Sequence, residues 1–97
     1  MIVSFKNKGV EDVFNGKNTK EASKICPPSI NRVAIRKLDQ LNVAINLNDL
    51  RVPPNNRLES LLGDRIGQSS IRINDQYRIC FVWTSAGAEQ VEIVDYH

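Results

Sequence analysis

Residues 70–83 read SIRINDQYRICFVW, and this stretch decides the fold of the chain. Segments 71–73 and 77–83 each carry a large apolar side chain at every second position. Side chains of a strand alternate between the two faces of a sheet, so the pattern predicts two strands with one apolar face. The polar triplet at 74–76 predicts the tight connection that joins them. Arg72 and Arg78 then share the opposite face.

Further strands are predicted on both sides of this pair. Residues 58–61 form a short strand-like run before a turn, and residues 1–5 also favour extended backbone. Downstream, Ser85-Ala86-Gly87 turns the chain into a last strand. Val91 and Ile93 would point from that strand into the core. The second half of the chain therefore predicts a meander of about four strands.

Helices are predicted in the first half of the chain. Asn7 is a typical N-cap, and Gly16 can end the helix that follows it. The polar residues 17–27 predict a loop. A periodic apolar pattern then predicts an amphipathic helix from about Ser29 to Asn46, with its basic side chains on a solvated face. The expected fold is one α+β domain, residues 1–97, with two N-terminal helices packed on a small, mainly antiparallel sheet.

Composition narrows the class of protein. A chain of 97 residues can bury one modest core, and shares of 41% apolar and 25% charged residues are typical of globular rather than disordered proteins. No apolar run reaches membrane-spanning length, and the N-terminus lacks the pattern of a secretion signal. Cys26 and Cys80 have neither metal-ligand nor redox-pair spacing. We expect a soluble, reduced, cytoplasmic protein with no membrane contact.

The stretch richest in chemical groups is Asp95-Tyr96-His97, which follows the last predicted strand. The imidazole of His97 titrates near neutral pH, and a phenol and a carboxylate stand beside it. Asp95 and His97 fall on one face of the strand and Tyr96 on the other. Alternation leaves open whether Tyr96 or His97 faces the arginines. A solvated chain end or a tag remnant is the competing interpretation.

The cationic side chains of residues 51–97 are all arginines. They are Arg51, Arg57, Arg65, Arg72 and Arg78. The planar fork of arginine matches the geometry of a phosphate group. Together with a proton-transfer group, such forks suit the cleavage of RNA, whose own 2′-hydroxyl is the nucleophile. The sequence has no cluster with metal-ligand spacing and no Gly-rich phosphate loop, so neither a metal nor another cofactor is expected.

Three segments resemble the HigB toxins of the RelE/ParE superfamily. They are residues 57–65 (RLESLLGDR), residues 70–81 (SIRINDQYRICF) and the ending Asp95-Tyr96-His97; the opening MIVSFK fits as well. The resemblance implies a RelE-like fold and a ribosome-dependent endoribonuclease that cuts mRNA without a cofactor. It also implies neutralisation by a HigA-like helix-turn-helix antitoxin, with operator DNA bound only through the toxin–antitoxin complex.

The same resemblance assigns roles to individual residues. His97 would transfer a proton to or from the 2′-hydroxyl or the leaving oxygen, and Asp95 would orient it. Tyr96 would position the RNA, and Arg78 would hold the scissile phosphate. Further RNA contacts are expected from a second set of side chains, namely Arg57, Arg65, Arg72 and Glu59.

One departure from the family pattern leaves other functions open. Many relatives carry a histidine and a lysine where this chain has Glu59 and Leu62, and leucine can supply neither charge nor a proton. A RelE-fold binding module with weak or no catalysis, acting through its antitoxin and operator DNA, is therefore an alternative. A ParE-like gyrase inhibitor is a third possibility, although the ending Asp95-Tyr96-His97 argues against it.

Overall fold

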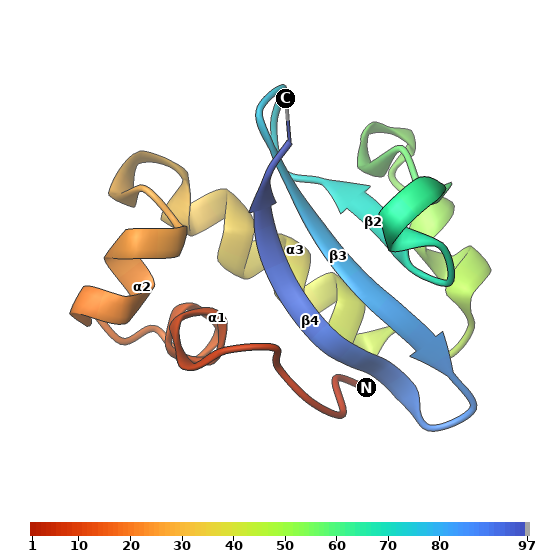
Figure 1. Cartoon of the computed structure of the whole chain (residues 1–97), viewed down its shortest axis with the longest axis horizontal. Helices are drawn as coiled ribbons and strands as arrows, with labels where there is room; N and C mark the ends of the chain where they lie inside the picture. Colours follow the sequence, from red (N-terminus) through yellow and green to blue (C-terminus); the bar gives the residue numbers. More distant parts are fainter. Residues whose placement is uncertain (97) are drawn as a thin grey trace.

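The computed structural model describes residues 1–96 of the chain. Four strands form one antiparallel sheet in the order β1-β2-β3-β4 (Figure 1). The strands span Glu59–Ser60 (β1), Ser69–Arg72 (β2), Tyr77–Thr84 (β3) and Gly87–Asp95 (β4). Helices pack on this sheet, so the predicted α+β class and the predicted four-stranded meander are confirmed.

The two faces of the sheet differ as the alternation predicted. Ile71, Ile79 and Ile93 stand opposite one another on neighbouring strands, and all three are buried. Burying one such side chain contributes roughly 1.5–3 kcal/mol. The next row across the sheet, Arg72 and Arg78, lies on the other face. The apolar face therefore packs against the helices and leaves the arginine face open.

A bulge in β4 changes the count of residues along the last strand. Cys80 pairs with Glu92 and Val82 pairs with Glu89, so β4 carries one residue more than β3 between these pairs. Gln90 lies in this interval with φ +52°. An extra residue in one strand bends that strand and increases the local twist.

Helix α1 (Lys8–Phe14) begins at Asn7, whose Oδ1 accepts a hydrogen bond from the Val10 N–H at 3.0 Å. This confirms the predicted N-cap. A second helix, α2 (Lys20–Ile25), lies where the sequence predicted a loop. The sequence of α2 has no periodic apolar pattern, because Ala22 is its one buried residue. The helix is instead stabilised by its N-cap and by contact with α1. Thr19 Oγ1 accepts from the Ala22 N–H at 3.1 Å.

Helix α3 (Asn31–Val43) crosses the apolar face of the sheet (Figure 1). It is shorter at both ends than predicted, because residues 28–30 form a separate 3₁₀ turn, η1 (Pro28–Ile30), and Ala44 has extended backbone. The prediction that its basic residues are all solvated is wrong for Lys37, which is only 6% exposed. Within residues 1–96, no helix combines the length and the apolar character needed to cross a membrane.

The N-terminal segment lies along the outer edge of β4, as Figure 1 shows. Ile2 bridges to Ala88 and Phe5 to Val91, both in parallel orientation. Backbone hydrogen bonds join the two segments, among them that from Val3 N to the Ala88 carbonyl at 2.7 Å. The predicted extended segment at residues 1–5 therefore protects the edge of the sheet without forming a regular strand.

Asp12 gives a test of how α1 is joined to α2. Its carboxylate is 1% exposed and accepts from Thr19 Oγ1 at 2.7 Å and from Lys8 Nζ at 3.2 Å. The Thr19 hydrogen bond, with Lys8, holds the pKa of Asp12 below its usual value. A lowered folded-state pKa stabilises the fold above the unfolded carboxyl pKa of about 4, and this stabilisation is lost as pH falls through the folded-state value.

We therefore expect Asp12→Asn to lower the urea midpoint of unfolding at pH 7. The difference from the unmutated protein should shrink as the pH falls from about 4 through the lowered pKa of folded Asp12, below which both side chains are uncharged. Urea titrations followed by circular dichroism at several pH values measure this. Asp39→Asn, at an exposed position of α3, is the matched control. An equal midpoint for Asp12→Asn at pH 7 would contradict the proposed link.

Candidate functional site

A shallow pocket of about 250 Å³ opens where the arginine face meets the turn between β2 and β3. Its walls come from the loop before β1, from β1, from β2 and its turn, from β3, and from the residue that follows β4. The lining residues are Arg57, Glu59, Arg72, Asn74, Asp75, Arg78 and Tyr96. Seven of the predicted site residues lie within the described residues 1–96, and five of them meet in this pocket; Asp95 and Arg65 do not line it.

Arg78 is fixed by two hydrogen bonds. Its Nε donates to Ser70 Oγ at 2.8 Å, and its Nη2 donates to the main-chain carbonyl of Arg57 at 2.7 Å. Ser70 is fully buried on β2, the strand that pairs with β3. The guanidinium is thus connected to both the sheet and the preceding loop.

Arg57 is placed by a buried polar contact next to it in the chain. It follows the 3₁₀ turn η3 (Pro54–Asn56) and has left-handed backbone, with φ +45°. Asn56 is fully buried; it accepts from Lys37 Nζ and donates to Gln40 Oε1 and to the Leu50 carbonyl, both at 3.1 Å. Burial lowers the pKa of Lys37, with a further contribution from Arg36.

The turn between β2 and β3 forms one wall of the pocket. Asn74 Oδ1 accepts from the backbone N–H groups of Gln76 at 2.9 Å and Tyr77 at 2.7 Å, which is a typical asparagine turn. Arg72 makes an ion pair with Asp75, whose side chain is 97% exposed. Such exposed pairs contribute at most about 1 kcal/mol, so an incoming anion can replace Asp75 at the guanidinium.

Tyr96 settles which side of the last strand faces the arginines. It lines the pocket and is 39% exposed, while its N–H donates to the Gln76 carbonyl at 2.6 Å. Asp95 stands opposite Tyr77 and accepts from Gln76 Nε2 at 3.2 Å. Asp95 does not belong to the pocket lining within residues 1–96. His97 lies outside the described residues, so its predicted role stays a prediction.

Arg65 lies apart from the pocket, although it was predicted to contact RNA. Its Nη1 donates to Gln68 Oε1 and to Glu92 Oε2, both at 3.1 Å, and Lys6 Nζ also reaches Glu92 Oε2 at 3.3 Å. Glu92 pairs with Cys80 across the sheet. The Arg65 role in RNA binding likewise stays a prediction.

Three residues that contribute to this site had no role predicted from the sequence, namely Ser70, Asn74 and Asp75. Ser70 lies two residues before Arg72, so a predicted strand that began one residue earlier would have placed it on the arginine face. Asn74 begins the polar triplet of the turn, where an asparagine side chain often bonds to backbone two residues on.

Neither cysteine is suited to nucleophilic attack. Cys80 is fully buried, and burial raises the pKa of its thiol. Burial also raises the pKa of Cys26, to about 11. Across the described residues 1–96, no three His, Cys, Asp or Glu side chains stand close enough together to hold a metal ion.

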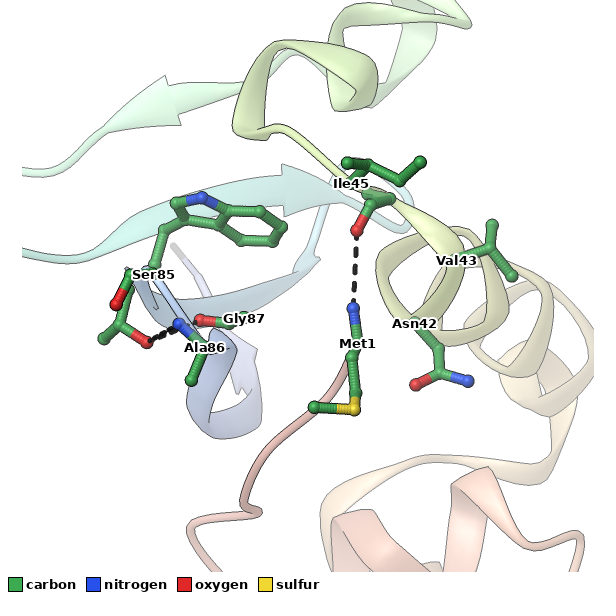
Figure 2. A pocket seen from close by; sticks show the side chains of 10 residues that line it. Met1, Asn42, Val43, Ile45, Ser85, Ala86 and Gly87 are labelled. Atoms are coloured by element: carbon green, nitrogen blue, oxygen red, sulfur yellow. Dashed lines mark hydrogen bonds between the residues drawn. The ribbon is translucent and has the colours of Figure 1, made fainter.

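A second hollow, of about 370 Å³, lies between the C-terminal end of α3 and the β3–β4 turn (Figure 2). Met1 points into it, and its amino group donates to the Ala44 carbonyl at 3.3 Å. Val43 and Ile45 line it and are 75% and 83% exposed. Among the described residues, no titratable side chain lines this hollow; the acid–base group that it contains is the Met1 amino group, which is hydrogen-bonded to the Ala44 carbonyl.

Comparison with known proteins gives a consistent result. Residues 3–97 match the family described as the RelE-like toxin of type II toxin-antitoxin system HigB. The chain is 39% identical over 88 residues to "Toxin HigB-1" of Vibrio cholerae serotype O1, covering 91% of this chain and 90% of that protein. It is also 46% identical over 55 residues to an uncharacterized protein of Haemophilus influenzae, covering 57% and 54% of the two chains.

The family match spans nearly the whole chain, and the V. cholerae toxin aligns over most of its length. Toxins of type II systems are neutralised by a protein antitoxin, so such a partner is implied for this chain. The α+β fold with a four-stranded antiparallel sheet agrees with that assignment. This chain belongs to the HigB-like family of RelE-fold toxins from type II toxin–antitoxin systems.

Proposed function

We propose that this toxin is a ribosome-dependent endoribonuclease that cleaves mRNA. One observation carries the proposal: three guanidinium groups, two carboxylates and a phenol converge on one open pocket. They belong to Arg57, Arg72, Arg78, Glu59, Asp75 and Tyr96. Guanidinium groups bind phosphate, and an exposed aromatic ring can stack on an unpaired base. An RNA strand with its bases splayed out fits this combination.

Cleavage needs one bond to form and one to break at the same phosphorus. The 2′-hydroxyl oxygen attacks, its proton passes to a base, and the 5′-oxygen leaves with a proton from an acid. We assign the stabilisation of the negative phosphorane to Arg78, with Arg57 and Arg72 beside it. His97 is the proposed proton-transfer group.

Two further side chains complete the proposed mechanism. Glu59 lies in the pocket as a carboxylate that can contact the 2′-hydroxyl, and the surrounding arginines offset its repulsion from phosphate. Asp95 is the proposed orienting partner of His97. Its bond to Gln76 ties the C-terminal end of β4 to the β2–β3 turn.

The proposed partners follow from this function. The antitoxin would be a HigA-like helix-turn-helix protein, and operator DNA would be bound only through the complex. The ribosome would present the mRNA, which locates the toxin in the cytoplasm.

A binding module without catalysis remains the second candidate. It is favoured by Leu62, an 81% exposed apolar side chain at a position where many relatives have lysine. The first experiment separates the two candidates. Cleavage of mRNA in a translation extract is mapped by primer extension, with and without ribosomes. Cuts that need the ribosome support the nuclease, and binding of antitoxin without cuts supports the module.

Removal of His97 should abolish these cuts while antitoxin binding and thermal unfolding stay unchanged, because only the proton-transfer group is lost. Primer extension on the two proteins at equal concentration measures the effect. If the truncated protein still cuts mRNA, a residue other than His97 must carry out the proton transfer.

Arg78→Ala should slow cleavage by roughly 30- to 1000-fold, as expected when about 2–4 kcal/mol of transition-state stabilisation is lost. Arg78→Lys should recover only part of the rate, because an ammonium group keeps the charge but not the fork. Single-turnover rates on programmed ribosomes measure both. Arg32→Ala, at an exposed position of α3, is the control, and unchanged cleavage by Arg78→Ala would exclude Arg78 from the site.

Leu62→Lys should leave the cleavage rate unchanged. Although many relatives carry a lysine here, the part of the chain that the structure describes does not bring Leu62 into the pocket lining. Ile66→Lys, 77% exposed in the same loop, controls for added charge that strengthens ribosome binding. A gain specific to Leu62→Lys would mean that RNA binding brings residue 62 to the phosphate.

A further inference from the structure

The free edges of the Arg78 guanidinium are set by its two hydrogen bonds. A guanidinium carries five N–H groups. Arg78 uses Nε–H toward Ser70 Oγ and one Nη2–H toward the Arg57 carbonyl. These two N–H groups lie on the same edge of the planar fork. The protein therefore occupies the Nε–Nη2 edge.

The remaining edge fits a phosphate. One Nη1–H and the second Nη2–H point away from the occupied edge, parallel to each other. Two parallel N–H groups bind two oxygens of one phosphate, which gives both strength and a fixed orientation. Arg78 lines the pocket, and within residues 1–96 this edge makes no hydrogen bond, so it is the part of the fork available to a ligand there.

Ser70 is well placed to hold the fork. It is fully buried on β2, where it pairs with Glu59 on one side and with Cys80 on the other. A strand held on both sides moves little, so the hydroxyl oxygen is a fixed acceptor. The second acceptor, the Arg57 carbonyl, follows Asn56 and its buried hydrogen bonds.

We propose that Ser70 is a positioning residue, which clamps the Nε–Nη2 edge of Arg78 together with the Arg57 carbonyl. The clamp leaves the Nη1–Nη2 edge to bind two oxygens of the scissile phosphate. This inference rests on the proposed function, because the phosphate is that of the mRNA. It adds a residue that touches no substrate and acts through Arg78.

The variants distinguish positioning from simple loss of structure. Ser70→Ala removes the acceptor, and Ser70→Thr restores a hydroxyl at the same position. Ser69→Ala is the matched control, because Ser69 is also buried on β2 but lies on the opposite face. Thermal unfolding of all three variants identifies any that fail to fold.

The first measurement needs no catalysis. In ¹⁵N-labelled protein, the Arg78 Nε–H signal should exchange slowly with water. It should broaden or disappear in Ser70→Ala, return in Ser70→Thr and stay unchanged in Ser69→Ala. Adding a short single-stranded 2′-O-methyl RNA, which cannot be cleaved, should shift the Arg78 Nη signals and leave its Nε signal protected.

The second measurement is single-turnover cleavage on programmed ribosomes. Ser70→Ala should lower the maximal rate by roughly 10- to 100-fold with little change in the half-saturating ribosome concentration, because misplaced groups mainly affect the chemical step. Ser70→Thr should recover most of the rate. A purely structural role would instead give a loss proportional to the unfolded fraction, without recovery by threonine.

The outcomes separate the two proposals. If the unmutated protein does not cut mRNA, the proposed nuclease activity is wrong. The Arg78 NMR signals alone then test whether Ser70 holds the guanidinium. An Arg78 Nε–H signal that is the same in Ser70→Ala overturns the clamp. Full cleavage by folded Ser70→Ala, with that signal lost, overturns the positioning role and leaves the nuclease intact.

Discussion

The fold depends on one constraint: alternate side chains of β3 must face the apolar core and the open face of the sheet. Ile79 and Phe81 are fully buried against the helices, while Arg78 points to the open face. The side-chain period of a strand is two, so a shift of one residue would bury the arginine and expose the apolar side chains. Core and pocket are therefore fixed by the same register. Pairing with β2 and β4 on both sides keeps that register in place.

A second constraint lies outside the sheet, in the loop that reaches the pocket. The uncharged side chain of Asn56 is buried. It accepts a hydrogen bond from Lys37 of α3 and donates one to the Leu50 carbonyl. A buried amide that lost these partners would cost about 1–3 kcal/mol. The loop is consequently held in one position, and the Arg57 carbonyl is held with it. The buried hydrogen bonds of Asn56 thus help to fix the position of the Arg78 guanidinium at the surface.

The sequence could predict the parts of this structure that depend on local patterns. Alternation from Ile71 to Trp83 predicted the two central strands of the meander and the face of Arg72 and Arg78. It did not predict α2, because that helix depends on the Thr19 cap and its packing against α1 rather than on a periodic apolar face.

The contacts that the sequence did not predict join residues of different structural elements. The buried state of Lys37 depends on Asn56, 19 residues away. The role of Ser70 depends on Arg78 across the β2–β3 pair. Alternation also left two options for the end of β4. The choice of Tyr96 followed only from the register with β3 and from its bond to Gln76.

The pairing of the N-terminal segment with β4 has a consequence for synthesis. The Gln90 N–H donates to Ser4 Oγ across a sequence separation of 86 residues. Contacts of such high order slow folding, since most of the chain must be present before they form. During translation the first residues cannot pair with β4 until β4 has left the ribosome, and Tyr96 leaves after β4. A nascent chain therefore lacks a complete arginine pocket until Tyr96 has left the ribosome.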